Sequence, residues 1–323
     1  MSDHLPNLVF HNFFKSTPRG FRGVPMPIEP SPCQVKAGRI AARVLREACQ
    51  LVKPGVKVVT ICARSERRII ELGGRPAFPC NVSTNEVAAH YTSPRGDESV
   101  IPDFGLVKID VGVHVDGYIA DTARTVDIDG TLNGFVEATD DALNEAIATM
   151  KPGVSVDEVG GVIERTIRAY GLNPVRELTG HSLGRFVLHG GKQIPNYPAG
   201  SSTRIEAGEV YAIEPFATSG RQVGDSKYVY IFSNTKREPH LEGTTERLYQ
   251  YLKKKYGYLP FASRWIGTTQ SGIDLIGEIR KLMKLGAIRG YPVLVEKSNR
   301  PVSQSEHTVF VTEDRCQILT QEG

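Results

Sequence analysis

The clearest pattern along the chain is a helical one that occurs twice. From Pro32, apolar residues recur at three- and four-residue spacing, which predicts a helix with one apolar face. These residues are Ala37, Ile40, Ala41, Val44, Leu45 and Ala48. The segment that follows, LVKPGVKVVTICARSERRIIELGG (51–74), is matched 98 residues later by TMKPGVSVDEVGGVIERTIRAYGL (149–172). Two copies indicate a duplicated half-domain, because stacked repeat proteins need three or more.

Local signals within the copies support helices. Gly73 and Gly171 occupy equivalent positions and predict helix ends, since glycine readily adopts the left-handed conformation there. Ser155 and Glu158 have the spacing of a capping box. A duplicated α+β unit favours a pseudo-two-fold fold with its functional site where the halves meet. The alternative is a chance resemblance, since the matched KPGV and ER stretches are short.

The rest of the chain predicts strands with one helical interruption. Strands are expected within 99–128, near 175–188, 209–218 and 225–233, and within 306–319. Residues 240–286 are instead helical and more basic, which predicts an insert in a β-rich half. Residues 1–31 carry many prolines and predict an irregular N-terminal extension whose phenylalanines could dock on the body.

Composition narrows the class of protein. The chain has 323 residues, 40% of them hydrophobic, and a net charge of +3 from 39 basic and 36 acidic residues. This balance gives no reason to expect specific DNA binding or attachment to a membrane surface. No apolar run is long enough for a transmembrane helix, and the first residues do not resemble a signal peptide. The five cysteines include no CxxC pair, so we expect reduced thiols in the cytoplasm.

Two carboxylates are expected to converge on one sheet face. Asp116-Gly117 is a strong hairpin signal within VKIDVGVHVDGYIADTARTVDI (107–128). If these two residues form the turn, Gly112 pairs with Asp121, and Asp110 lies diagonal to Asp121 on an otherwise apolar face. Such a pair needs a shared proton, a basic partner or a pair of metals. The alternative is that one aspartate lies outside the core.

Further residues of metal-ligand type occur downstream. His181 and His189 share the glycine-flanked segment GHSLGRFVLHGG, Glu214 interrupts the apolar run VYAIEPF, and Glu306 begins SEHTVFV. Each residue alone is weak evidence, because a single histidine is more often a core or surface residue. Together they offer oxygen and nitrogen ligands without thiolate. That set favours two divalent ions such as Mn, Fe, Co or Zn.

The sequence resembles the type 2 methionine aminopeptidases, in particular the archaeal ones. The resemblance covers about residues 33–323 and is carried by PAFPCNVSTNEVAAHYT, KIDVGVHVDGYIADTA, LTGHSLGRFVLHGGKQIPN, EVYAIEPFATSG and SEHTVFVT. It implies an α+β pita-bread fold with pseudo-two-fold symmetry over residues 32–323, after an extension at 1–31. A helical insert at about 238–292 is typical of type 2.

The resemblance also implies a metal centre and an activity. Asp121 and Glu306 would bridge two ions, Asp110 would bind one, and His181 and Glu214 would complete the other. The reaction implied is removal of the initiator methionine from nascent proteins, by hydrolysis with a water or hydroxide that bridges the ions. The same ligands bind several divalent metals, so the metal is left open among Co, Mn, Fe and Zn.

The remaining site residues follow from the same resemblance. His90 and His189 match two histidines that are not ligands, and either could stabilise the oxyanion. Glu214 is the candidate to move the proton while it stays a ligand. Phe78 and Tyr291 match the pocket for the methionine side chain, although Phe78 could equally be a plain core residue.

Partners and alternatives stay open at this stage. The resemblance implies nascent N-termini as partners in the cytoplasm, a monomer, and the ribosome as a further candidate. The basic run at 253–255 could meet ribosomal RNA, although a solvated helix face explains it more simply. One alternative is a proline-specific peptidase, which shares the five ligands but usually carries an extra N-terminal domain. Another is a relative that has lost catalysis and binds nucleic acid or protein.

Overall fold

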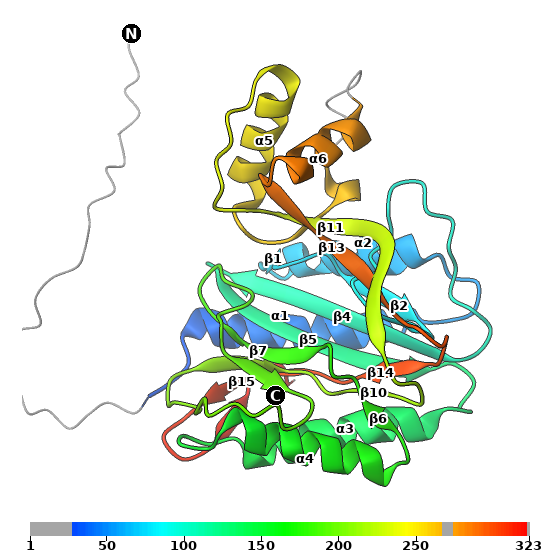
Figure 1. The fold of residues 1–323 in the computed structure, drawn as a ribbon, viewed down its shortest axis with the longest axis vertical. Coiled ribbons are helices and arrows are strands. Elements are labelled where there is room, and N and C mark those ends of the chain that lie inside the picture. Colours follow the sequence, from blue (N-terminus) through cyan, green and yellow to red (C-terminus); the bar gives the residue numbers. More distant parts are fainter. Residues whose placement is uncertain (1–27, 267–273, 322–323) are drawn as a thin grey trace, which may run out of the picture.

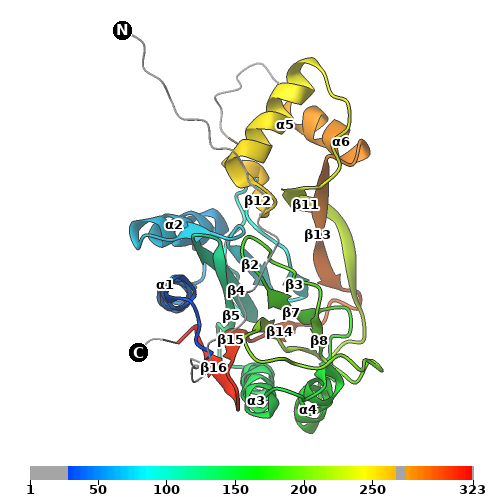
Figure 2. The same ribbon diagram turned by 90° about the vertical axis from the view of Figure 1, so that its left-hand side faces the viewer.

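The two copies of the repeat form equivalent helix pairs. The computed structural model describes residues 28–266 and 274–321, so most of the predicted extension at 1–31 lies outside the described residues. The first pair is α1 (Pro32–Cys49) and α2 (Val58–Glu71), and the second is α3 (Asn133–Thr149) and α4 (Val156–Ala169). The bounds of α2 and α4 keep the 98-residue offset of the sequence repeat. In Figure 2 one pair lies to the side of the central strands and the other below them.

The predicted local signals operate in these helices. The Ser155 Oγ accepts a hydrogen bond of 3.1 Å from the Glu158 backbone N–H, which satisfies a free donor at the start of α4. Gly73 and Gly171 follow α2 and α4 with φ of 81° and 73°, in the left-handed region that favours glycine. No described helix combines the length and the apolar character that crossing a bilayer requires.

The first sheet is built around a long hairpin. It contains β4 (Leu106–Val115) and β5 (Tyr118–Asp127), with β1 (Arg75–Pro76) and β2 (Asn81–Thr84) on the other edge of β4. The turn is Asp116-Gly117, both with positive φ, as the hairpin signal predicts. Val115 pairs with Tyr118 and Gly112 with Asp121, so the predicted register is confirmed.

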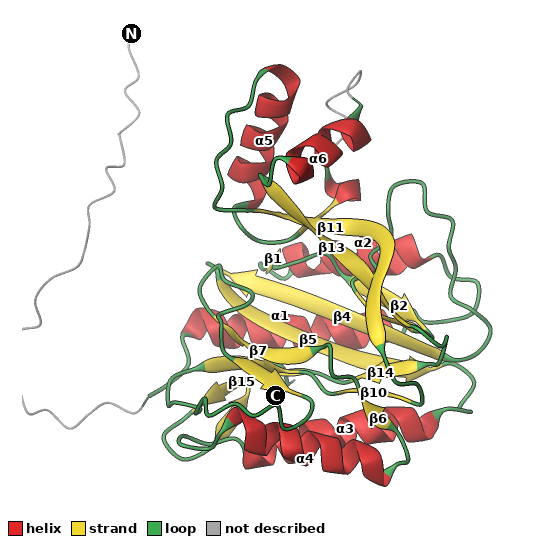
Figure 3. Ribbon diagram, in the orientation of Figure 1, coloured by secondary structure: helices red, strands yellow, loops and turns green. Residues whose placement is uncertain are grey.

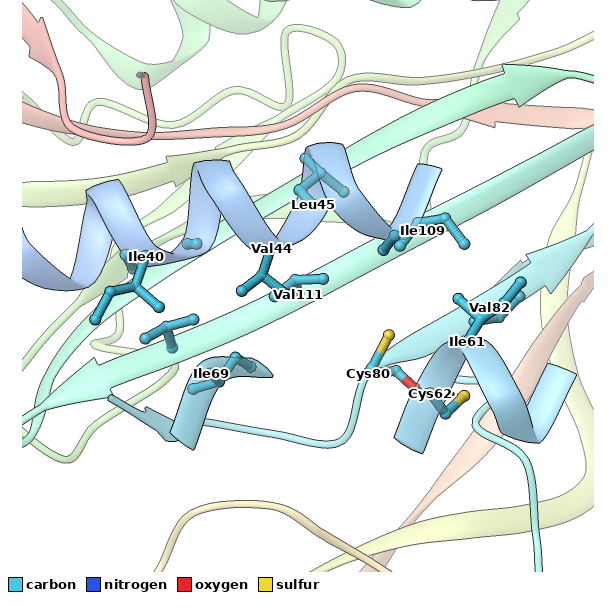
Figure 4. Close-up of a cluster of buried hydrophobic side chains, with 14 of the residues drawn as sticks. Ile40, Val44, Leu45, Ile61, Cys62, Ile69, Cys80, Val82, Ile109 and Val111 are labelled. Carbon is cyan, nitrogen blue, oxygen red and sulfur yellow. Dashed lines mark hydrogen bonds between the residues drawn. The ribbon is translucent and has the colours of Figure 1, made fainter. Parts of the chain in front are cut away.

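Packing of the first helix pair on this sheet forms one of the two large apolar clusters among the described residues. Ile40, Val44 and Leu45 of α1 lie against Ile109 and Val111 of β4, as Figure 4 shows. These five side chains are buried, so the apolar face read from the sequence is the one that packs. The packed helix fixes the back of the strand that carries Asp110.

Two further sheets complete the second half. The larger has the order β16-β15-β9-β7-β8 and the smaller β14-β10-β6. Their bounds are β6 (Asn173–Pro174), β7 (Thr179–Leu183), β8 (Gln193–Pro195), β9 (Val210–Ile213), β10 (Phe216–Thr218), β14 (Val302–Gln304), β15 (His307–Val311) and β16 (Cys316–Ile318). An antiparallel bridge between Ala123 and Glu306 joins the halves.

The strands expected near 175–188 and 209–218 are shorter than the sequence suggests. Glu214 was expected inside a strand, but it lies between β9 and β10, where Pro215 follows and cannot donate a ladder hydrogen bond. The ladder breaks there, and the Glu214 carboxylate leaves the regular alternation of the strand.

The helical block stands apart from the paired helices. Helices α5 (Gly243–Tyr256) and α6 (Leu275–Lys284) lie beyond a sheet of order β12-β11-β13-β3, at the top of Figures 1 and 3. The strands are β3 (Val87–Ala89), β11 (Val223–Asn234), β12 (Phe261–Ala262) and β13 (Ile288–Glu296), and a short 3-10 helix, η1, spans Ser263–Trp265. This helical block has its own apolar cluster, which includes Leu248, Leu252 and Leu282.

A buried polar network ties this block to the first half. The Glu66 carboxylate of α2 accepts hydrogen bonds from the Trp265 indole at 2.7 Å, from the Arg264 guanidinium, and from the backbone N–H of Cys80 at 3.2 Å. Arg264 also donates to the Thr92 hydroxyl at 2.6 Å. Three segments far apart in the sequence therefore meet at one carboxylate.

Candidate metal centre

Four carboxylates and a histidine from both halves meet at the junction of the sheets. Asp110 and Asp121 come from β4 and β5, His181 from β7, Glu214 from the break after β9, and Glu306 from the residue before β15. The His181 Nε2 lies 3.8 Å from the Asp121 Oδ2 and 3.7 Å from the Glu214 Oε1. Ligand atoms of Asp121, His181 and Glu306 all lie within 4.8 Å of one another. The hairpin and the Ala123–Glu306 bridge produce this convergence.

The cluster carries more negative charge than its surroundings can balance. Burial raises the pKa of Asp110 to about 7. Burial, and after it the neighbouring carboxylates, raise the pKa values of Asp121, Glu214 and Glu306 well above the ordinary range. Within residues 28–266 and 274–321, none of the four carboxylates has a lysine or arginine as an ion-pair partner. Only protons or bound cations can then neutralise the cluster.

Unpartnered ligand atoms show that the cluster fits divalent ions. The Asp110 Oδ1 and the Asp121 Oδ1 are buried without a hydrogen-bond partner, which is costly unless something else binds nearby. Burial, and after it the neighbouring His189 ring, lower the pKa of His181 to about 3, so its imidazole is neutral, the form that binds a metal. Carboxylate and imidazole ligands suit borderline divalent metals.

Three supporting residues were not found from the sequence. The Asn81 amide donates to the Asp110 Oδ2 at 3.4 Å, and the Gln304 amide donates to the Glu214 Oε2 at 3.4 Å. The Thr308 hydroxyl both accepts from the Asp121 backbone N–H and donates to its carbonyl, at 2.7 Å each. Gln304 and Thr308 each lie two residues from Glu306, a spacing that places strand residues on one face and could have suggested them.

The two further histidines take different places around the cluster. The ring of His189 lies 4.4 Å from that of His181 between centroids. His90 has a left-handed backbone, with φ of 65°, and its Nδ1 lies 3.1 Å from the Pro292 carbonyl oxygen. Burial is the first cause that lowers the pKa of both residues, to about 4 for His189, where Arg289 and His90 add to the effect. Both side chains are therefore neutral near pH 7 and keep one N–H donor each.

The two expected pocket residues lie on different walls. Phe78 packs on the hairpin, where it occupies the space that a side chain at Gly112 would fill, and it belongs to a small apolar cluster with Ile119. Tyr291 of β13 makes an edge contact with His90, with ring centroids 5.8 Å apart. Among the described ring contacts, Phe78 and Tyr291 are not paired with each other.

The charge repulsion leads to a prediction for the metal-free protein. An acid whose pKa is raised on folding costs stability above its unfolded pKa, and the cost grows as pH rises towards the folded value. Asp121→Asn removes such a group, so we expect the chelator-treated variant to be more stable than wild type at pH 8, by about 1–3 kcal/mol. The gain should shrink towards pH 4, where Asp121 is protonated in the folded protein and, with a pKa of about 3.9, about half protonated in the unfolded chain. Urea titrations at both pH values measure it.

Groups that titrate elsewhere contribute equally to wild type and Asp121→Asn, so they cancel in the difference between the two free energies of unfolding. A variant that loses stability at pH 8 would show that the carboxylate is not under strain in the metal-free protein. With Mn²⁺ added, the order should reverse, because wild type alone keeps the complete ligand set.

Comparisons with known proteins identify the family of the chain. The model of metallopeptidase family M24 matches residues 33–313. The methionine aminopeptidase of Methanothermobacter thermautotrophicus is 47% identical over 291 residues, 89% of this chain and 97% of that relative. A solved structure described as a thermophilic Arx1 has a TM-score of 0.78 at 20% identity, with 90% of each chain covered. The methionine aminopeptidase of Thermotoga maritima has a TM-score of 0.66 at 24% identity, covering 92% of this chain and 100% of that one.

The chain belongs to metallopeptidase family M24. Within that family, relatives between 41% and 47% identical over most of its length are archaeal methionine aminopeptidases. These findings confirm the expected metallopeptidase class and the α+β pita-bread fold.

Proposed function

We propose that the chain is a metalloaminopeptidase that removes the initiator methionine from nascent polypeptides in the cytoplasm. The observation that carries this proposal is the buried cluster of four carboxylates and a neutral histidine in a chain related to methionine aminopeptidases. The helices α5 and α6 between residues 238 and 292 support the type 2 assignment.

Charge balance supports two ions rather than one. Four ionised carboxylates carry a charge that two divalent cations neutralise, whereas one would leave a buried excess. Asp121 and Glu306 are the bridging candidates, Asp110 serves one ion, and His181 and Glu214 serve the other. When bound, such a pair supplies Lewis-acid charge that allows water to attack near neutral pH.

The protein's own residues would orient the substrate and move protons. Glu214 is held through its Oε2 by Gln304, which leaves the Oε1 toward His181, so it can accept a proton from the attacking water and pass it to the leaving amine. Neutral His189 and His90 can each donate an N–H to the scissile carbonyl oxygen as negative charge develops there. Asp110 would hold the ion that receives the free amine of the substrate, which would confine cleavage to the first residue.

A prediction follows for the side-chain pocket. Phe78→Ala removes most of the aromatic surface beside Gly112, so we expect kcat/KM for a methionyl peptide to fall about 10- to 50-fold. Phe78→Leu keeps much of that surface and should lose less. Steady-state kinetics on Met-Ala-Ser measure both variants. Unchanged kinetics in a folded Phe78→Ala protein would assign this ring to the core alone.

The function itself is tested by release of methionine from Met-Ala-Ser across a panel of Mn²⁺, Fe²⁺, Co²⁺ and Zn²⁺, with an Ala-Pro peptide as the competitor. We expect release from Met-Ala-Ser only. Faster turnover of the proline peptide would favour a proline-specific peptidase. Calorimetry with each metal separates these two peptidases from a non-catalytic binding protein, which would bind no divalent ion.

A further inference from the structure

An arginine at the edge of the site is held in place by the residues around it. Arg289 of β13 donates to the Tyr291 hydroxyl at 2.6 Å, and its Nε lies 3.1 Å from the Ser233 Oγ on β11. Its guanidinium carbon lies 4.9 Å from the centre of the Tyr291 ring. Hydrogen bonds and stacking together orient the flat group, although the residue is exposed.

The charge of Arg289 is not neutralised locally. Among the described residues no carboxylate forms an ion pair with it, whereas Arg264 and Arg68 are paired with glutamates. Tyr291, whose hydroxyl accepts from Arg289, makes an edge contact with His90, with ring centroids 5.8 Å apart, so the guanidinium lies at the border of the site. An exposed, oriented and unbalanced cation therefore stands beside the Tyr291 wall of the site.

The path of a substrate runs past this cation. If the proposed function is correct, the methionine side chain lies by Tyr291 and the scissile carbonyl by His189. The peptide beyond the scissile bond then has to leave across the exposed rim. An extended chain advances about 3.3 Å per residue. The second residue stays beside the scissile bond, and the third is the first whose side chain reaches the rim.

We propose that Arg289 makes the enzyme select substrates by charge, with preference for peptides whose third residue carries a carboxylate. The inference rests on the proposed aminopeptidase function and adds a specificity-determining residue to it. A carboxylate there forms a charge-assisted pair with the guanidinium, and a lysine there is repelled.

The test compares kcat/KM for the amidated peptides Met-Ala-Asp-Ser, Met-Ala-Asn-Ser and Met-Ala-Lys-Ser. Amidation removes a terminal carboxylate that would itself attract Arg289. We expect the order Asp, Asn, Lys, with a ratio of Asp to Lys of about five to ten at low salt. The ratio should approach one at about 0.5 M KCl, because the rim is open to solvent.

Variants separate charge selection from a structural role. Arg289→Gln should bring the ratio close to one, Arg289→Glu should invert it, and Arg289→Lys should retain most of it. Arg280→Gln removes the same charge from the exposed side of α6 and should leave the wild-type ratio unchanged.

Three outcomes would overturn the inference. One is a wild-type ratio near one at low salt. Another is an equal loss for all three peptides in Arg289→Gln, which would mean that the arginine only fastens Tyr291. The third is the absence of methionine release from every peptide with every metal, which contradicts the proposed function first and removes this inference with it.

Discussion

Asp121→Ala and Glu306→Ala are each expected to abolish methionine release, with kcat/KM lower by about a thousandfold or more. Both carboxylates lie among the buried ligand atoms at the junction of the halves, and each is the candidate to bridge two ions. Removing one takes a ligand from both positions, so calorimetry should show weaker binding of both ions. If the replaced carboxylate bound only one ion, calorimetry should show weaker binding of that ion alone.

A matched control keeps this prediction specific. Glu313→Ala removes an exposed carboxylate in the turn after β15 and should leave both kinetics and metal binding as in wild type. Circular dichroism checks that the variants are folded. Near-wild-type turnover in folded Glu306→Ala would show that Glu306 is not a bridging ligand and would contradict the two-ion proposal.

His189→Ala is expected to lower kcat by about a hundredfold while the affinity for metal changes little. The His189 ring lies against His181, but its loop position places it at the open side of the cluster. It can therefore donate to the substrate without being a ligand. Because its pKa is lowered to about 4, no step in kcat from His189 should occur between pH 5 and 8.

The control for this variant is His240→Ala, which removes an exposed histidine just before α5 and should leave kcat unchanged. Metal titrations of the same preparations complete the comparison. If His189→Ala lost its metal, the assignment of the five ligands would be wrong, and His189 would have to be counted among them.

Local signals predicted the fold best where the chain satisfies them within a few residues. Asp116-Gly117 set the hairpin and the pairing of Gly112 with Asp121, because a two-residue turn leaves one register. The repeat predicted α2 and α4 with their glycine ends. These features depend on neighbours in sequence, so the sequence alone carries them.

Contacts between distant segments were harder to predict. Asn81 and Gln304 hold two of the acidic ligands, but nothing local marks an amide as the partner of a carboxylate 29 or 90 residues away. Glu214 was placed inside a strand because the apolar run VYAI continues into Phe216, and the break at Pro215 was overlooked. The five ligand candidates themselves were identified through their spacing and family resemblance, and the structure brings them together.

The Glu66 network makes the first half of the molecule depend on residues 238–292. The carboxylate is buried, and two of its three donors belong to η1. Removing residues 238–292 would leave the negative charge of Glu66 buried without these two donors. The backbone N–H of Cys80, between Phe78 and Asn81, would be the remaining one of the three. A shorter chain without residues 238–292 should therefore keep its fold better with an uncharged residue at position 66.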